Sequence, residues 1–184
     1  MPVLSTVPDL ADRLLGPRIV LLARELDDDV AAETCGRLLL LAAEDSRREV
    51  TLQILSPGGS PVAAMAVHDT VRSLPVDVVT VANGSLAGPV PFLVASGTPG
   101  RRFALPHASF HVPATGTAGT ASVRGSHPGD VRVLAEHLQQ RRTEIDELTA
   151  RYCGGPVAGP RERWLGAAEA AAAGIVDHVR GVDS

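Results

Sequence analysis

The residues of greatest chemical interest lie in a turn near the middle of the chain, at 84–89, which reads GSLAGP. The β-branched run before it, 78–82, predicts a buried strand, and the apolar run after it predicts a helix with Pro89 and Pro91 in its first turn. Several hydrolases carry a nucleophile on such a strand-to-helix turn, because the turn lifts one side chain clear of the sheet. Here the tip is Gly88, which has no side chain to attack a substrate.

Composition limits the classes of function. The 184 residues suit one domain, and 45% hydrophobic and 21% charged residues are typical of a globular protein. A net charge of −4 argues against nucleic-acid binding. No apolar run is long enough for a membrane span, and residues 1–16 lack the pattern of a signal peptide, so we expect a cytoplasmic protein. Cys35 and Cys153 are isolated, and we expect no disulfide, metal or cofactor.

Strands and helices alternate around the turn, which predicts an α/β domain with a largely parallel sheet. In the expected strand 50–55, Thr51 and Gln53 alternate with apolar residues, so one face is covered and the other meets solvent or a polar partner. The expected strands are 19–22, 50–55, 76–82, 101–105, 109–112 and 175–179, and the expected helices are 8–15, 27–44, 61–74, 89–97, 130–152 and 166–173.

The longest expected helix, 130–152, follows a segment rich in Gly, Ser, Thr and Ala at 115–129, which predicts a loop or arm. Two interpretations of the apolar stripe on this helix are open: packing on its own domain, or contact with another subunit. The stripe comprises Val131, Leu134, Leu138, Ile145, Leu148 and Tyr152.

Four segments together resemble the proteolytic subunit of the caseinolytic Clp protease, ClpP, over nearly the whole chain. They are the SPGG turn at 56–59, the MAxxDT helix at 65–70, the RFALP strand at 102–106, and AEA with GIVD at 168–177. The resemblance implies a crotonase-like fold in one domain, 1–184, with a short N-terminal segment at 1–7 and a protruding handle arm and helix at about 113–155. It also implies stacked heptameric rings that enclose serine-protease sites and are fed by a AAA+ unfoldase.

The chain departs from this family at the nucleophile. The family's turn reads GMAASMGAF with the catalytic serine fifth, and Gly88 takes that place here. Pro89 takes the next position, whose backbone N–H helps to hold the oxyanion, and proline has no N–H. Losing one such donor costs about 3 kcal/mol of transition-state stabilisation. The resemblance therefore implies a catalytically inactive subunit that assembles beside an active paralogue.

The family's base and acid have counterparts here. The segment 110–113, FHVP, resembles its MHQP and implies His111 as the base, with His107 as a weaker alternative in a turn. Glu162, in the RDRF-like segment 161–164, would be the acid. The alternatives are a surface Arg–Glu pair, or a contact through Arg161 between the two stacked rings of subunits. If Ser85 replaced the lost nucleophile, Ser85 and His111 would form a displaced site in an active serine endopeptidase.

The resemblance also bears on partners and on a third function. Gly58 and Gly59 remain suited to binding an extended peptide backbone. Thr51 and Gln53 stand where the family often places the aromatic side chains that receive the unfoldase, and 1–7 is too short for a full pore hairpin. Both features predict that the unfoldase docks through the paralogue. A crotonase-type acyl-CoA enzyme is the third possibility, although the turn at 84–91 holds no Asp or Glu as a base.

Overall fold

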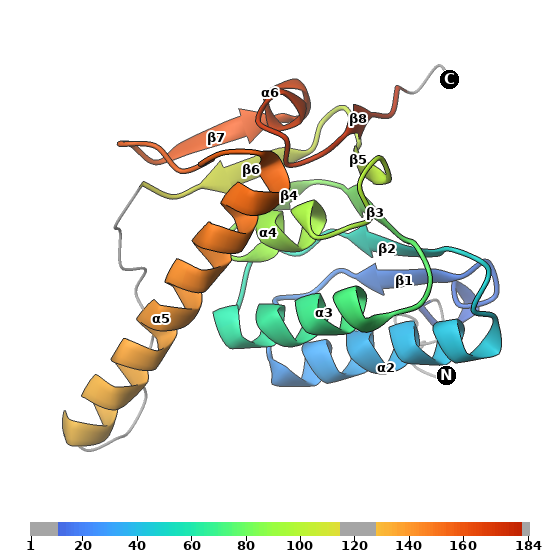
Figure 1. Ribbon diagram of the computed structural model, residues 1–184, viewed down its shortest axis with the longest axis horizontal. Coiled ribbons are helices and arrows are strands. Elements are labelled where there is room, and N and C mark those ends of the chain that lie inside the picture. Colours follow the sequence, from blue (N-terminus) through green and yellow to red (C-terminus); the bar gives the residue numbers. More distant parts are fainter. Residues whose placement is uncertain (1–10, 115–127, 182–184) are drawn as a thin grey trace, which may run out of the picture.

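The computed structural model describes residues 11–114 and 128–181, and a five-stranded sheet with the strand order β1-β2-β3-β5-β8 lies at its centre (Figure 1). All four neighbouring pairs of strands are parallel, which confirms the expected α/β class. The expected N-terminal segment 1–7 and most of the arm, 115–127, lie outside the described residues. The strands of this sheet are β1 (Ile19–Leu22), β2 (Val50–Ile54), β3 (Val78–Ala82), β5 (Arg102–Ala104) and β8 (His178–Val179).

Helices α2 (Asp28–Glu44) and α3 (Pro61–Ser73) lie side by side along the sheet (Figure 1). Each begins where a polar side chain caps it: the Asp27 carboxylate accepts from the Val30 N–H, and the Ser60 hydroxyl accepts from the Ala63 N–H. Both helices bury apolar side chains in the main core together with one face of the sheet. That core includes Val20, Leu22, Leu38, Leu41, Leu52, Ile54, Ala64 and Val67.

The alternation in β2 is confirmed. Leu52 and Ile54 are fully buried, whereas Thr51 and Gln53 point to the opposite face of the sheet and are half-buried. The two polar positions of this strand are therefore open to the other side of the sheet.

The chain leaves the large sheet after β3 and enters a second one. This three-stranded sheet has the order β4-β6-β7 and consists of β4 (Ser85–Leu86), β6 (Ser109–Val112) and β7 (Arg163–Gly166). The sequence predicted β6 but not β4 or β7. β4 has only two residues, and β7 is an exposed edge strand with one buried side chain, Leu165, so neither has a periodic pattern.

Several expected elements differ in extent from the observed ones, among them the first helix and the last strand. The helix expected at 8–15 is helical at 11–13 and then becomes a turn, and residues 8–10 are outside the described part. The strand expected at 175–179 was wrong for its first half. Ile175 and Val176 are buried in the core as an irregular connection, and only β8 pairs with the sheet. An apolar run can be buried by other side chains without hydrogen bonding to a neighbouring strand, so burial alone does not predict a β-strand.

The remaining helices are α4 (Val90–Ala95), α5 (Pro128–Cys153) and α6 (Ala167–Ala172). The long α5 protrudes from the body of the molecule (Figure 1). Its second half packs on its own domain, with Ile145 buried and Leu148 and Tyr152 against the core. Residues 132–137, nearer its start, are exposed; Leu134 is 41% exposed. Packing on its own domain is therefore confirmed for the second half of the helix, and contact with another subunit stays a prediction for the exposed part.

Arg102 holds the inner end of α5 to the large sheet. Its guanidinium donates to the Asp177 carboxylate at 2.5 and 3.0 Å and to the carbonyl oxygens of Tyr152 and Gly174. Burial opposes ionisation of Asp177, but the hydrogen bonds and charge of Arg102 outweigh it, so the pKa of Asp177 is lowered. One buried arginine thus joins β5, the end of α5 and the segment before β8.

Candidate active site

Gly88 forms the corner between β4 and α4. Its φ of 56° lies in the left-handed region, which favours glycine. A Cβ built on Gly88 would lie 3.7 Å from the Gly59 N atom and 3.8 Å from the Gly58 Cα, both ordinary van der Waals distances. The backbone therefore has room for a side chain at this corner, and that side chain would face the turn at Gly58 and Gly59.

The amides next to Gly88 are not available to a ligand. Pro89 is the N-cap residue just before α4 and has no N–H. The N–H of Val90 donates to the Ala87 carbonyl oxygen at 3.1 Å. This side of the corner thus presents no free backbone donor at either of the two positions that follow Gly88.

The turn at Gly58 and Gly59 is held against the segment that enters α2. The Leu26 N–H donates to the Gly58 carbonyl oxygen, and the Ser60 N–H donates to the Leu26 carbonyl oxygen. A Cβ on Gly59 would lie 2.2 Å from the Leu26 carbonyl oxygen, so only glycine fits there. The turn at Gly58 and Gly59 is therefore close-packed and lies opposite Gly88, and its part in peptide binding stays a prediction.

His111 and Glu162 are brought together although they are 51 residues apart. The His111 Nε2–H donates to the Glu162 carboxylate at 2.6 Å, and the His111 side chain is 19% exposed and the Glu162 side chain 65%. The register of β6 and β7 places Trp164 opposite His111, with 5.1 Å between the ring centres. Glu162 thus pairs with the imidazole and not with Arg161, which the sequence left open.

Ser85 is occupied elsewhere. Its hydroxyl lies 3.0 Å from the Ser109 hydroxyl, its neighbour on β6. Ser109 and His111 are two residues apart on β6 and share a face of the small sheet, so Ser85 lies about one strand repeat, roughly 7 Å, along that face from His111. His107 lies in an exposed turn, as expected.

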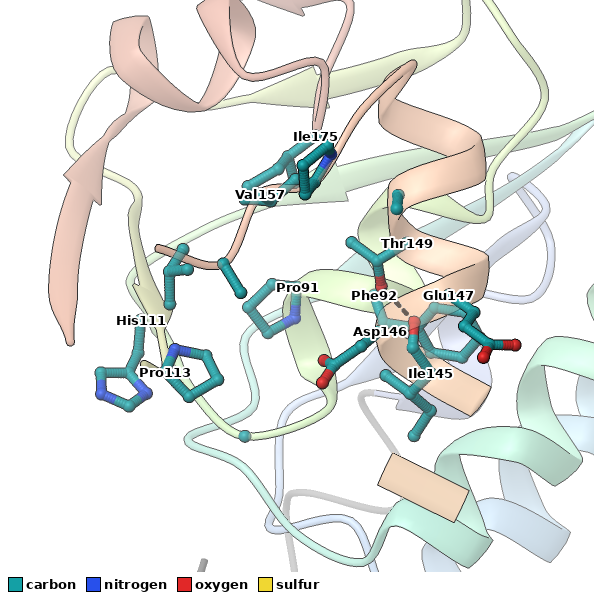
Figure 2. A pocket seen from close by; sticks show the side chains of 15 residues that line it. Pro91, Phe92, His111, Pro113, Ile145, Asp146, Glu147, Thr149, Val157 and Ile175 are labelled. Atoms are coloured by element: carbon teal, nitrogen blue, oxygen red, sulfur yellow. Dashed lines mark hydrogen bonds between the residues drawn. The ribbon is translucent and has the colours of Figure 1, made fainter. Parts of the chain in front are cut away.

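A cavity of about 300 Å³ opens beside Gly88 and His111 (Figure 2). Its wall comes from the start of α4, the end of β6, the second half of α5 and the segment 156–158. Most of these side chains are apolar. Asp146 points from α5 toward the space between Pro91 and Pro113, whereas Glu147 points to the other side of the helix (Figure 2).

The sequence did not predict that α5 lines this cavity. Asp146 follows Ile145, a member of the apolar stripe, so its place at the edge of a packed helix face was the available signal. Burial raises the pKa of Asp146, and the charge of Arg142 on the preceding turn partly opposes this. Trp164 was missed as well, because its position depends on the pairing of β6 with β7.

A buried aromatic cluster fixes α4 from behind. The ring of His68, on α3, stacks on Phe92 with 4.8 Å between centres, and its Nε2 lies 2.7 Å from the Tyr152 hydroxyl. Its Nδ1 lies 2.9 Å from the Asp69 carboxylate. Because these residues come from α3, α4 and α5, the corner at Gly88 rests on three helices that pack against one another.

Within residues 11–114 and 128–181, no three His, Cys, Asp or Glu side chains gather as they would around a metal ion. In the same part of the chain, no helix has the length and apolar character needed to cross a membrane.

The chain matches known proteins over nearly its whole length. The family model described as Clp protease matches residues 5–183. Proteolytic subunit 2 of the ATP-dependent Clp protease of Corynebacterium efficiens is 40% identical over 178 residues, which cover 93% of this chain and 86% of that protein. Proteolytic subunit 1 from Mycobacterium tuberculosis is 40% identical over 183 residues, 96% of this chain and 88% of that one. The chain therefore belongs to the Clp protease family.

Proposed function

We propose that this chain is a ClpP-type subunit of a Clp protease complex that does not itself hydrolyse peptides. In this proposal it acts as a structural or regulatory ring subunit beside an active paralogue. The observation that carries the proposal is the corner at Gly88: it has the left-handed backbone and the open space of a nucleophile position, but no hydroxyl or thiol. Pro89 and the engaged N–H of Val90 remove donors that an oxyanion would need.

The arrangement of His111 supports the same proposal. In a Ser-His-Asp triad, imidazole Nε2 takes the proton of the serine while Nδ1–H donates to the acid. Here Nε2, and not Nδ1, faces the acid, so the ring is turned relative to such a triad and would have to rotate before its Nε2 could serve a hydroxyl at the corner. The pair is suited to holding the ring in place, and we assign to it a structural role at the mouth of the cavity.

A displaced active site is the second candidate, since Ser85 and His111 share one face of the small sheet. Its weakness is that the Ser85 hydroxyl is paired with Ser109. The two candidates predict different chemistry for the same purified protein, because only the second has a reactive serine.

The partners follow from the family and from the polar face of β2. The relatives are named as subunits of ATP-dependent Clp proteases, and we propose heptameric rings of this chain with itself or with an active paralogue in the cytoplasm. Thr51 and Gln53 are half-buried and polar, and they offer little apolar area to a docking loop. An AAA+ unfoldase would then bind through the paralogue.

The direct test incubates the full chain with a fluorogenic peptide and with a serine-directed fluorophosphonate. We expect no turnover and no labelling. Turnover or labelling that is abolished by Ser85→Ala and reduced by His111→Ala would establish the displaced site instead. Native mass measurement of the chain, alone and mixed with candidate paralogues, tests the ring; the proposed role requires mixed rings or rings of this chain alone.

A further inference from the structure

We propose that the cavity beside Gly88 holds a basic side chain, arginine or lysine, of a bound peptide, and that Asp146 selects its charge. This inference rests on the proposed function, because it assumes a subunit that binds peptides without cleaving them. It assigns a substrate class to the cavity.

The size and lining of the cavity fit one long side chain. A volume of about 300 Å³ is at the lower end for ligand pockets, which suits an amino-acid side chain better than a cofactor. Pro91, Val157 and Ile175 form an apolar wall around it (Figure 2). Arginine and lysine bury an aliphatic stem against such surfaces while the charged end remains with a polar partner.

The charge at the cavity is negative. Asp146 points into it, and neither arginine nor lysine is among the residues that line it (Figure 2). No ion pair joins Asp146 to another residue in the described part of the chain, although the charge of Arg142 reaches it. Asp146 is an exposed residue on the wall of the cavity, so its carboxylate can form an ion pair with a cation that enters there. A bound guanidinium or ammonium group would provide that cation.

The position of the cavity suits a peptide whose backbone lies along the turn at Gly58 and Gly59. That turn faces the corner at Gly88, and Gly88 itself lines the cavity. The end of β6, at Val112 and Pro113, forms the other side. A side chain that leaves such a backbone at the corner would enter between Pro91 and Pro113, toward Asp146 (Figure 2).

The test compares three fluorescein-labelled tripeptide amides, Ala-Ala-Arg, Ala-Ala-citrulline and Ala-Ala-norleucine, by fluorescence anisotropy with the full chain. Citrulline has nearly the shape of arginine without its charge. We expect the arginine peptide to bind about threefold more tightly than the citrulline peptide, the size expected for an ion pair at an exposed site. Added salt should reduce this ratio.

Two variants isolate the carboxylate. Asp146→Asn removes the charge and keeps the shape, so the ratio of the two affinities should fall to about one. Glu136→Gln removes a charge from an exposed position on the outer part of α5 that does not line the cavity, so it should leave the ratio unchanged. Equal binding of the two peptides, no binding of either at about 1 mM, or a ratio that survives Asp146→Asn would overturn the proposal.

Hydrolysis is measured in the same samples, which separates the two proposals. If the peptides are cleaved, the inactive subunit is refuted and the affinity ratio still reports on the cavity. If they are not cleaved and the ratio is one, only the inference about Asp146 fails.

Discussion

Replacing Gly88 by serine, alone and together with Pro89→Met, should restore the two missing parts of the site in turn. The first change supplies a hydroxyl at the corner. The second supplies a backbone N–H at the adjacent position, with the residue that the ClpP turn carries there. Gly88→Ala is the matched control, because it imposes the same backbone conformation without a hydroxyl.

The structure sets the size of both effects. A side chain on a residue at φ 56° lowers the unfolding free energy by about 1–2 kcal/mol. No further clash is expected, because a Cβ at Gly88 would lie 3.7 Å from its nearest neighbour, the Gly59 N atom. Gly88→Ser and Gly88→Ala should therefore lose the same amount of unfolding free energy. Restoring one oxyanion donor is worth about 10²–10³ in rate, so the double variant should exceed Gly88→Ser by that factor.

Urea denaturation measures the first effect, and the rate of fluorophosphonate labelling, followed by intact mass, measures the second. Two results would contradict the reasoning. If the folded double variant is labelled no faster than Gly88→Ala, then Gly88 is not at a nucleophile position that His111 can serve. If Gly88→Ser reacts as fast as the double variant, the assignment of Pro89 as a lost donor is wrong.

Arg102→Met should lower the unfolding free energy by about 2–3 kcal/mol in urea titrations, because it leaves the partly buried Asp177 carboxylate without its cation; a loss below about 1 kcal/mol would contradict this. The lowered pKa of Asp177 stabilises the fold above pH 3.8, so the advantage of the wild type over Asp177→Asn should shrink as the pH falls below that value. Gly59→Ala should cost about 2 kcal/mol or more through backbone clash, measured by thermal unfolding. Burial raises the pKa of Cys153 to about 11, so its reactive thiolate fraction should rise about tenfold per pH unit up to pH 10. In the Cys35→Ser variant, which keeps only Cys153, the rate of modification by iodoacetamide should rise by the same factor; a plateau near pH 9 would refute this.

The elements with clear periodicity were predictable from the sequence. The alternation in β2 and the capped helices α2 and α3 depend on neighbours within a few residues, so local patterns define them. The small sheet was not predictable in full. β7 is paired along one side only and carries two exposed residues before Leu165, so its strand conformation depends on β6 and not on its own sequence.

The candidate site divides in the same way. Gly88 and Pro89 were found from a local pattern, since a turn between a strand and a helix is a short-range feature. The contact between His111 and Glu162 depends on pairing of β6 with the chain 51 residues later, and the resemblance to ClpP, not periodicity, pointed to it. Asp146 was missed because the side of a helix that borders a cavity depends on how the helix docks.

The helix α5 runs without glycine or proline from Val131 to Cys153, so it contains none of the residues at which helices usually bend. Its inner half forms one wall of the cavity, and its outer half stands exposed beyond the body of the molecule (Figure 1). We therefore expect the two halves to move together as one rigid helix. A neighbour that tilted the outer half would shift Ile145 and Asp146 with it, and the width of the cavity would change.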